Sequence, residues 1–335
     1  MADAPFQRVA VIGAGAWGTA LALVARRAGR DVVIAAREPD VVDAINRRHE
    51  NPLFLPGIAL DPAIRAGGDA GEAVAAADAV LLVAPAQHLR AVAGSIAAHA
   101  RSGMPAVICA KGVERGSGAL MSELVAEILP RTPLAVLSGP TFAAEVARGQ
   151  PTAVTLAAAD AAVGAQLVSA LGGATFRPYL STDVVGAQVG GAVKNVIAIA
   201  CGIVTGRALG DNARAALMTR GLAEIMRLGE ALGGQRETLM GLSGLGDLSL
   251  TCNGPQSRNM SLGIALGKGR TLDEALAGKR SVAEGVDSAA AIAALAGRKG
   301  VEMPIVAAVD AIVHRGADIE AAIAALLARP FKAEH

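Results

Sequence analysis

The chain has 335 residues, of which 53% are hydrophobic and 18% are charged, and its formal net charge is +1. This length is enough for two domains, and the spread of Lys and Arg along the whole chain excludes a basic surface for nucleic acid. The longest run without Asp, Glu, Lys or Arg covers residues 9–25, which is shorter than the roughly 20 apolar residues of a membrane-spanning helix. Because the N-terminal residues also lack a secretory signal pattern, we expect a cytoplasmic protein without a membrane span.

Short apolar runs alternate with helical patterns in the first half of the chain. Uninterrupted runs rich in β-branched residues predict strands at 9–13, 32–36, 79–84, 106–110, 134–138 and 152–157. Helical patterns lie between them at 16–28, 87–100 and 118–129. Because such runs have no polar face, we expect strands buried on both sides, in a parallel α/β sheet covered by helices.

From about Asp183 the strand patterns stop, and the rest of the chain is predicted to be all-helical. Helices are expected at 184–204, 211–232, 257–267, 282–297, 304–313 and 318–329. Asp318 is a suitable N-cap for the last helix, which Pro330 ends. We therefore predict two domains, residues 1–182 and residues 183–335.

The segment VAVIGAGAWG contains Gly13, Gly15 and Gly18 in a Gly-x-Gly-x-x-Gly pattern. It directly follows a predicted strand and opens a predicted helix, which is the context that a dinucleotide-binding motif requires. The first glycine allows a tight turn, the second lets the backbone approach a pyrophosphate, and the third lets the helix pack closely on the strand. A purely structural turn is the alternative.

The end of the second predicted strand bears on the choice between NAD and NADP. An NAD-selective site usually has an acidic residue there, for the ribose 2′-hydroxyl. This chain instead has Arg37, followed by Glu38, and a guanidinium suits a 2′-phosphate in charge and shape. The pattern favours NADP, unless Arg37 is simply an exposed surface residue.

A charged residue interrupts the most apolar helical segment. Residues 190–202 are apolar on nearly every helical face, yet Lys194 lies in the first turn of this stretch with Asn195 beside it. An unpaired buried charge costs several kcal/mol. Lys194 therefore either reaches water with its end group or has a function.

Two other polar residues lie in otherwise apolar or glycine-rich segments. Lys111, in CAKGVE, follows the carboxyl end of a predicted strand, where open α/β sheets bind ligands. Asp247, in GLGDLSLTC, is expected in a tight glycine loop, where it could also be an Asx-turn residue. A buried lysine with a carboxylate neighbour can stay charged, donate a proton and recover it.

The segment NGPQSRN reads as a loop that enters a helix, with Ser257 as N-cap and Arg258 and Asn259 in the first turn. Backbone N–H groups, the helix dipole and an arginine together favour an anion, most naturally a phosphate, although Ser257 could be a cap and nothing more. A nicotinamide cofactor, a proton-donating lysine and a phosphate site together predict hydride transfer to the carbonyl of a small phosphorylated ketone.

Cysteine and histidine spacing indicates neither a disulfide framework nor a metal site. Cys109, Cys201 and Cys252 are odd in number, far apart along the chain and in apolar surroundings, as expected for buried thiols in a reducing compartment. No His-x-x-x-His or Cys-x-x-Cys spacing occurs, so we expect no metal ion.

The chain resembles the bacterial NAD(P)-dependent glycerol-3-phosphate dehydrogenases, which interconvert dihydroxyacetone phosphate and sn-glycerol 3-phosphate. Long segments carry the resemblance, among them VIGAGAWGTALA, AKGVE, LSGPTFAAEVARG, QVGGAVKNVIAIACGI, GLSGLGDLSLTC, QSRN and VAEGV. It implies a Rossmann-type, doubly wound N-terminal domain and an all-α C-terminal domain, with the site between them. It also implies NADP(H) or NAD(H) as cofactor and a role in phospholipid synthesis. The oligomeric state stays open, a homodimer included.

The roles that the resemblance implies agree with the interpretation of the residues themselves. The catalytic set would be Lys194 as proton donor and acceptor, with Lys111 and Asp247. The substrate contacts would be Lys111, Gly139, Thr141, Lys194, Asp247, Ser257, Arg258 and Asn259. The cofactor contacts would be Gly13, Gly15, Ala16, Trp17, Gly18, Arg37, Lys111, Ala143, Arg258, Val282 and Glu284.

Two alternatives remain at this point. β-Hydroxyacid dehydrogenases and ketopantoate reductases also join a Rossmann domain to a helical domain with a catalytic lysine. The hydroxyacid enzymes, however, have a Lys-x-x-x-Asn pattern, whereas Lys194 and Asn195 are adjacent here. A non-catalytic NADPH sensor would keep the glycine motif but would have no use for the two lysines and Asp247.

Overall fold

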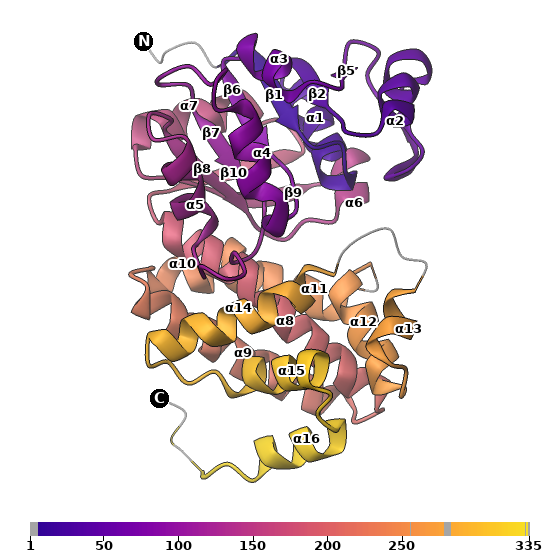
Figure 1. Ribbon diagram of the computed structural model, residues 1–335, viewed down its shortest axis with the longest axis vertical. Coiled ribbons are helices and arrows are strands. Elements are labelled where there is room, and N and C mark those ends of the chain that lie inside the picture. Colours follow the sequence, from indigo (N-terminus) through magenta and orange to yellow (C-terminus); the bar gives the residue numbers. More distant parts are fainter. Residues whose placement is uncertain (1–5, 255, 278–282, 332, 334–335) are drawn as a thin grey trace.

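The computed structural model describes residues 6–254, 256–277, 283–331 and 333. An α/β unit formed by the N-terminal half lies above a helical unit formed by the C-terminal half (Figure 1). The last strand of the sheet ends at Ser181 and the first long helix of the lower unit begins at Val184.

The α/β unit is built on an eight-stranded sheet. Its strands are β1 (Arg8–Ile12), β2 (Asp31–Ala35), β5 (Arg65–Gly67), β6 (Ala79–Leu82), β7 (Ala106–Ile108), β8 (Leu134–Ser138), β9 (Thr152–Ala158) and β10 (Phe176–Ser181). They are ordered β10-β9-β8-β7-β6-β1-β2-β5, and a separate hairpin pairs β3 (Glu50–Asn51) with β4 (Leu55–Ala59). The six strands predicted from the sequence are confirmed. The edge strands β5 and β10 were not predicted.

The expectation of a parallel sheet is wrong at one junction, because β9 runs antiparallel to β8. All the other neighbouring strands of this sheet are parallel. The chain from β8 to β9 contains only the five-residue helix α6 (Ala143–Ala147). A parallel return usually needs a full crossover helix across the sheet, so this short connection reverses the chain instead.

Helices cover both faces of the sheet, which confirms the doubly wound architecture. Alternate residues of β1 belong to two different cores: Val9 and Val11 pack with α1 (Ala16–Arg27), α6 and α7 (Ala161–Leu171). Ala10 and Ile12 pack with α3 (Ala70–Ala75), α4 (Leu89–Ile96) and α5 (Met121–Ile128). This alternation is the period of two that a strand imposes on its side chains. The short helix α2 (Pro39–Asp43) follows β2.

The lower unit is arranged around α8 (Val184–Gly206), whose residues from Gly186 to Val204 are all buried. The other helices are α9 (Asp211–Ala231), α10 (Arg236–Met240), α11 (Asp247–Asn253), α12 (Arg258–Gly267), α13 (Leu272–Leu276), α14 (Glu284–Arg298), α15 (Pro304–Arg315) and α16 (Ile319–Leu327). The six predicted helices are confirmed with shifted ends, and the Asp318 side chain caps α16 as predicted. The short helices α10, α11 and α13 were not predicted.

Small residues let α8 and α12 cross at close range. A Cβ atom on Gly202 would lie 2.8 Å from the Cα of Gly263, and one on Gly206 would lie 3.0 Å from the Cα of Gly267. Any larger side chain at these positions would separate the two helices. Among the described residues, α8 is the one helix long and apolar enough to cross a membrane, but 89% of its apolar window is buried inside the protein.

The three cysteines are buried and free, as predicted. Cys201 of α8 and Cys252 of α11, which are distant in sequence, are nevertheless neighbours in the fold. Their mutual hydrogen bond, together with burial, raises the pKa of Cys252 well above its usual value. No group of His, Cys, Asp and Glu side chains able to hold a metal ion occurs in the described part of the chain.

Candidate active site

The glycine motif forms the turn from β1 into α1. Gly13 has a φ of +117°, and a Cβ atom there would lie 2.7 Å from the carbonyl oxygen of Val83. A Cβ atom on Gly18 would lie 1.9 Å from the carbonyl oxygen of Gly13. Gly15, in contrast, has no atom within 4 Å of its Cβ position and precedes the first residue of α1, Ala16. The backbone therefore leaves open space at a helix N-terminus, which fits a pyrophosphate.

Two further residues expected at the cofactor, Trp17 and Arg37, belong to the start of α1 and to the segment after β2. Trp17 is in the first turn of α1, and its buried indole nitrogen has no hydrogen-bond partner. Arg37 follows the carboxyl end of β2; its side chain is 90% exposed and its guanidinium lies 2.9 Å from a carboxylate oxygen of Glu38. This surface pair is weak in water, so Arg37 can exchange Glu38 for an anionic ligand.

Lys194 lies in the middle of α8, in agreement with the helix expected at 184–204. The helix begins at Val184, because Asp183 caps it by accepting a hydrogen bond from the backbone of Gly186. The Lys194 side chain is only 10% exposed. Its ammonium nitrogen lies 2.9 Å from Oδ1 of Asp247 and 2.8 Å from the hydroxyl of Thr251. Its burial is therefore compensated by polar partners.

Asp247 joins Lys194 to Lys111. It is the first residue of α11, directly after the π-helical turn η3 (Leu242–Gly246), and so does not lie in the glycine loop that we expected. Its carboxylate is 1% exposed, and Oδ2 accepts a 2.6 Å hydrogen bond from the ammonium of Lys111. Lys111 also donates to the carbonyl oxygen of Gly139 at 3.1 Å. One buried carboxylate thus holds two lysines, one from each half of the chain.

The pKa values in this cluster reflect burial and mutual charge. Burial lowers the pKa of Lys194, and the negative charge of Asp247 opposes that shift, while Lys111 adds to it. Burial alone would raise the pKa of Asp247, but the charges of Lys111 and Lys194 hold it below its usual value. A lysine with a lowered pKa beside a firmly ionised carboxylate is suited to give up a proton and take it back.

Thr251 belongs to the cluster, although the sequence analysis did not select it. Its hydroxyl donates to the backbone carbonyl of Asp247 at 2.6 Å, one helical turn earlier, and accepts the hydrogen bond from Lys194. The spacing of four residues from Asp247 puts both side chains on one face of a helix. That signal was present in the sequence, but the helix α11 was not predicted.

Glycines in α8 make room for the partners of Lys194. A Cβ atom on Gly190 would lie 2.5 Å from the carbonyl oxygen of Ser243 in η3. One on Gly191 would lie 2.8 Å from the hydroxyl of Ser138 and 3.4 Å from the side chain of Lys111. The two glycines that precede the lysine by one turn therefore allow the segment carrying Asp247 and the side chain of Lys111 to approach α8.

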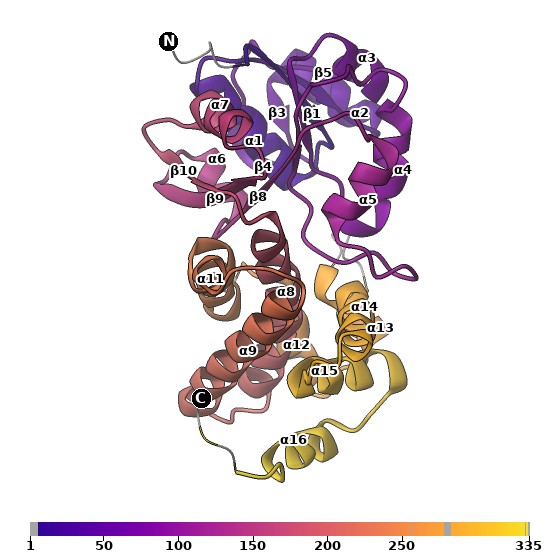
Figure 2. The same ribbon diagram turned by 90° about the vertical axis from the view of Figure 1, so that its left-hand side faces the viewer.

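The segment after β8 lies beside Lys111. Gly139 accepts the hydrogen bond from Lys111, and the hydroxyl of Thr141 donates to the same carbonyl at 3.3 Å. Ala143 begins α6. In Figure 2, α8 and α11 lie directly beneath the edge of the sheet formed by β8 and β9. The carboxyl end of β8, which leads into Gly139, thus faces the helices that carry Lys194 and Asp247, as ligand sites do in other open α/β sheets.

The predicted phosphate segment is formed as expected. Ser257 caps α12, because its hydroxyl accepts a hydrogen bond from the backbone of Met260 at 3.2 Å. Arg258 is the exposed first residue of α12. The buried amide of Asn259 donates to Asn195 at 2.9 Å and accepts from the backbone of Gly285 at 3.0 Å. Asn259 therefore links α12 to α8 and to the start of α14.

Glu284, the first residue of α14, brings a second carboxylate near the lysines. Burial raises its pKa, while the positive charges of Arg258, Lys194 and Lys111 oppose that shift. These charge effects relate Glu284 to both the lysine cluster and the start of α12. Val282, also expected at the cofactor, lies outside the described residues.

Comparisons with known proteins show the family of the chain. Residues 8–164 match the family model described as NAD-dependent glycerol-3-phosphate dehydrogenase N-terminus, and residues 183–324 match the corresponding C-terminus. Glycerol-3-phosphate dehydrogenase [NAD(P)+] of Rhodospirillum rubrum is 63% identical over 97% of this chain and 93% of the relative. The enzyme of the same name from Parvibaculum lavamentivorans is 60% identical over 98% of both chains.

Solved structures give the same result. The crystal structure of glycerol-3-phosphate dehydrogenase from Coxiella burnetii superposes with a TM-score of 0.92 and 39% identity, over 96% of this chain and 99% of that one. A ketopantoate reductase from Ralstonia eutropha shares the fold at a TM-score of 0.61 and 18% identity, over 92% of this chain and 98% of that one. The chain belongs to the NAD-dependent glycerol-3-phosphate dehydrogenase family.

Proposed function

We propose that the chain catalyses reversible hydride transfer between NAD(P)H and dihydroxyacetone phosphate, giving sn-glycerol 3-phosphate, with Lys194 as the proton donor and acceptor. The observation that carries the proposal is the carboxylate of Asp247 between the ammonium groups of Lys194 and Lys111. A bound nicotinamide supplies the hydride. The residues of the chain must then supply the proton and stabilise the charge that develops on the substrate oxygen.

Lys194 in its ammonium form donates a proton to the oxygen of the former carbonyl as the carbon receives the hydride. Lys111 stabilises the developing negative charge, because a fixed positive charge in a buried site acts strongly on it. Asp247 keeps both side chains in place, and Thr251 orients Lys194. In the reverse direction the neutral amine of Lys194 takes the proton from the alcohol.

The cofactor would be held by the turn around Gly13, Gly15 and Gly18, with Ala16 and Trp17 at the start of α1. The open space in front of Gly15 supports a pyrophosphate at this point. Arg37 would bind the 2′-phosphate of NADP(H), and Ala143 and Glu284 would contact the cofactor from α6 and α14. Val282, two residues before Glu284 in the sequence, would also contact it.

The phosphate of the substrate would bind at the start of α12, to Ser257, Arg258 and Asn259. The ten-residue helix, the exposed arginine and the capped N-terminus support this assignment. Gly139 and Thr141 would complete the substrate site from the end of β8. In this division residues 1–182 bind the cofactor, and residues 183–335 supply most of the substrate site and the proton.

We propose a cytoplasmic enzyme that supplies sn-glycerol 3-phosphate for phospholipid synthesis. Three buried free thiols suit a reducing compartment. For the assembly we propose a homodimer that uses α16, because this apolar helix has no fully buried residue and exposes 79% of Leu327. Sedimentation of the purified protein measures that state.

Lys194→Met tests the proton donor, because methionine keeps most of the side-chain volume and removes the charge. We expect a folded protein of equal or greater thermal stability that still binds NADPH, with kcat lower by roughly 10²- to 10⁴-fold. Stopped-flow and steady-state absorbance of NADPH, with a thermal melt, measure these quantities. A variant with more than about a tenth of the wild-type kcat would exclude Lys194 as the donor.

Asp247→Asn tests the charge balance through the pH dependence of kcat. Reduction needs Lys194 protonated, so kcat falls as the pH rises through the pKa of Lys194. Removal of the carboxylate lowers that pKa further, and the falling limb should move to lower pH by roughly one unit or more. Asp310→Asn is the matched control, since Asp310 is also buried and ion-paired but lies in α15. An unmoved limb in Asp247→Asn contradicts the assignment.

Arg37→Ala tests cofactor selectivity. We expect KM for NADPH to rise roughly tenfold or more, because a charge-assisted contact is lost, while KM for NADH hardly changes. Arg47→Ala, which removes another exposed and ion-paired arginine, should change neither value. Equal losses with both cofactors would instead assign Arg37 to the fold or to the shared pyrophosphate.

Arg258→Ala tests the phosphate site. We expect kcat/KM for dihydroxyacetone phosphate to fall by a factor that corresponds to a loss of about 3 kcal/mol in transition-state stabilisation, the upper range for a charged hydrogen bond. The loss should appear in kcat as well as in KM. The wild-type protein should already have a very low kcat/KM with unphosphorylated dihydroxyacetone, and the substitution should change that value little. The same fold-loss with both substrates, with NADPH affinity measured separately, would assign Arg258 to the cofactor alone.

The same assay separates the two alternatives. A hydroxyacid dehydrogenase or ketopantoate reductase would oxidise NADPH with its own carboxylate substrate and not with dihydroxyacetone phosphate. A non-catalytic sensor would bind NADPH and would convert neither the carboxylate substrate nor dihydroxyacetone phosphate. The phosphorylated ketone is favoured by two features. Lys194 and Asn195 are adjacent, and Arg258 is the first residue of α12, whose N-terminus Ser257 caps.

A further inference from the structure

We propose that Arg90, which is outside the catalytic and binding set, positions Lys111 by holding the loop that carries it. The inference rests on the proposed function, because it concerns the same lysine. Lys111 is not part of a helix or strand: it follows β7, which ends at Ile108. Its placement therefore depends on the loop of residues 111–120.

The loop is closed on itself by backbone hydrogen bonds. Val113 and Leu120 form an antiparallel bridge. The amide of Glu114 donates to Ala119 at 3.0 Å, and the amide of Gly118 donates back to Glu114 at 3.0 Å. The closed part of the loop therefore contains Glu114, which lies three positions after Lys111.

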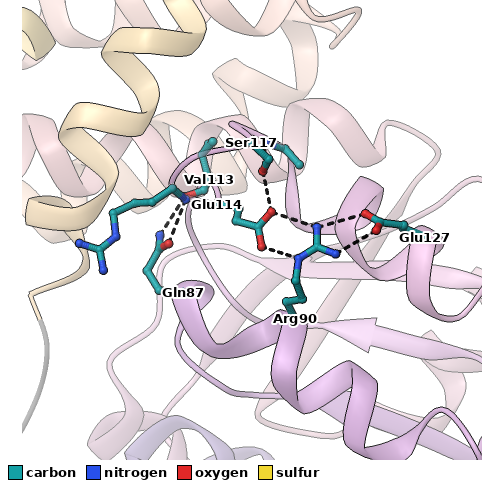
Figure 3. Close-up of polar contacts among 8 residues, drawn as sticks. Gln87, Arg90, Val113, Glu114, Ser117 and Glu127 are labelled. Atoms are coloured by element: carbon teal, nitrogen blue, oxygen red, sulfur yellow. Dashed lines mark hydrogen bonds and ion pairs between the residues drawn. The ribbon is translucent and has the colours of Figure 1, made fainter.

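Arg90 of α4 holds this residue by a forked ion pair (Figure 3). Its Nε and Nη2 donate to the two carboxylate oxygens of Glu114 at 2.8 and 3.1 Å. The Glu114 side chain is only 15% exposed, and its hydrogen bonds to Arg90 hold its pKa below the usual range. Ser117 donates to the same carboxylate at 2.5 Å. A bidentate pair with a largely shielded carboxylate fixes geometry better than a single contact between two exposed side chains, although the Arg90 side chain itself is 42% exposed.

Gln87 holds the backbone on both sides of Glu114, as Figure 3 also shows. Its amide nitrogen donates to the carbonyl of Val113 at 2.9 Å, and its amide oxygen accepts from the backbone of Arg115 at 3.0 Å. Both Gln87 and Arg90 come from the segment after β6. The loop is therefore fixed to this segment by its backbone and by one side chain.

The opposite side of the loop contacts α14. Arg115 pairs with Asp287 at 3.1 Å, and Arg298 donates to the carbonyl of Ser117 at 3.3 Å. Gly112, next to Lys111, has space for no Cβ atom, because one would lie 2.7 Å from the Cβ of Ala86. The loop after Lys111 is consequently held between α14 and the segment that bears Gln87 and Arg90, and a loosened Glu114 would make the backbone that carries Lys111 less precisely placed.

Arg90 also pairs with Glu127 of α5, at 3.0 and 3.1 Å. That second pair connects α4 to α5, and Glu127 makes no hydrogen bond or ion pair with the described residues 111–120. The two glutamates therefore separate positioning from simple stabilisation: Glu114→Gln weakens the hold on the loop, and Glu127→Gln weakens only the contact between the helices. Glu127 is 65% exposed, so its loss should be nearly neutral.

Steady-state kinetics of four variants test the proposal. We expect Arg90→Gln and Glu114→Gln each to lower kcat/KM for dihydroxyacetone phosphate by roughly ten- to a hundredfold, the cost of a small misplacement of a catalytic group. KM for dihydroxyacetone phosphate should rise and kcat should fall, while the Kd for NADPH stays within about twofold because the adenosine end is untouched. Glu127→Gln and Arg8→Ala, which removes another arginine ion pair of the same unit, should match the wild type.

A double-mutant cycle shows whether Arg90 acts through Lys111. In a Lys111→Met background, Arg90→Gln should have almost no further effect on kcat/KM, because the side chain that it positions is gone. Additive losses, or a loss in Glu127→Gln equal to that in Glu114→Gln, would overturn the proposal. If Lys111→Met itself kept full activity, the role proposed for Lys111 would be wrong, and that outcome is distinct from a failure of Arg90 alone. If Arg90→Gln lowers the melting temperature, the values of kcat/KM for Glu114→Gln and Glu127→Gln decide whether Arg90 positions Lys111: a loss in Glu114→Gln alone supports the proposal, and equal losses contradict it.

Discussion

The carboxylate of Asp247 between two ammonium groups is the interaction on which the site depends. Each of these charges would cost several kcal/mol if it were buried alone. Together they leave a net positive charge in a nearly closed environment, where it acts strongly on a developing oxyanion. Because Lys111 follows a strand and Lys194 and Asp247 come from separate helices, this cluster forms only when both halves of the chain are folded against each other.

The composition of the chain is part of the same arrangement. Aromatic residues make up only 2% of the chain, and it has 40 glycines. Gly190 and Gly191 leave the space into which η3 and the side chain of Lys111 fit, and Gly202 and Gly263 let α12 lie against α8. Bulkier residues at Gly190 or Gly191 would push η3 and the side chain of Lys111 away from α8 and so disturb the partners of Lys194. The close packing around α8 therefore allows the charged Lys194 side chain to be buried with its polar partners, in addition to stabilising the helix.

Much of this could be predicted from the sequence, where local patterns determine the structure. The glycine motif, the buried strands, the long helices and the cap at Ser257 depend on neighbouring residues, and each was found. The sequence also predicted that Lys194 needs polar partners, because its charge interrupts a helix that is otherwise apolar. The antiparallel β9 and the helical setting of Asp247 did not follow, because they depend on how segments distant in sequence meet. Thr251 was missed for the same reason: its signal is a spacing on the unpredicted helix α11.

The two lysines are held in different ways, and the difference follows from where the chain puts them. Lys194 is in the middle of a helix that is buried on all sides, so packing fixes its backbone and only its end group needs polar partners. Lys111 is on a loop, whose backbone has no such packing on every side and must be fixed by hydrogen bonds. The polar contacts of Gln87, Arg90 and Arg115 are concentrated on that loop. A site made from one helix and one loop thus needs its dedicated positioning residues on the loop.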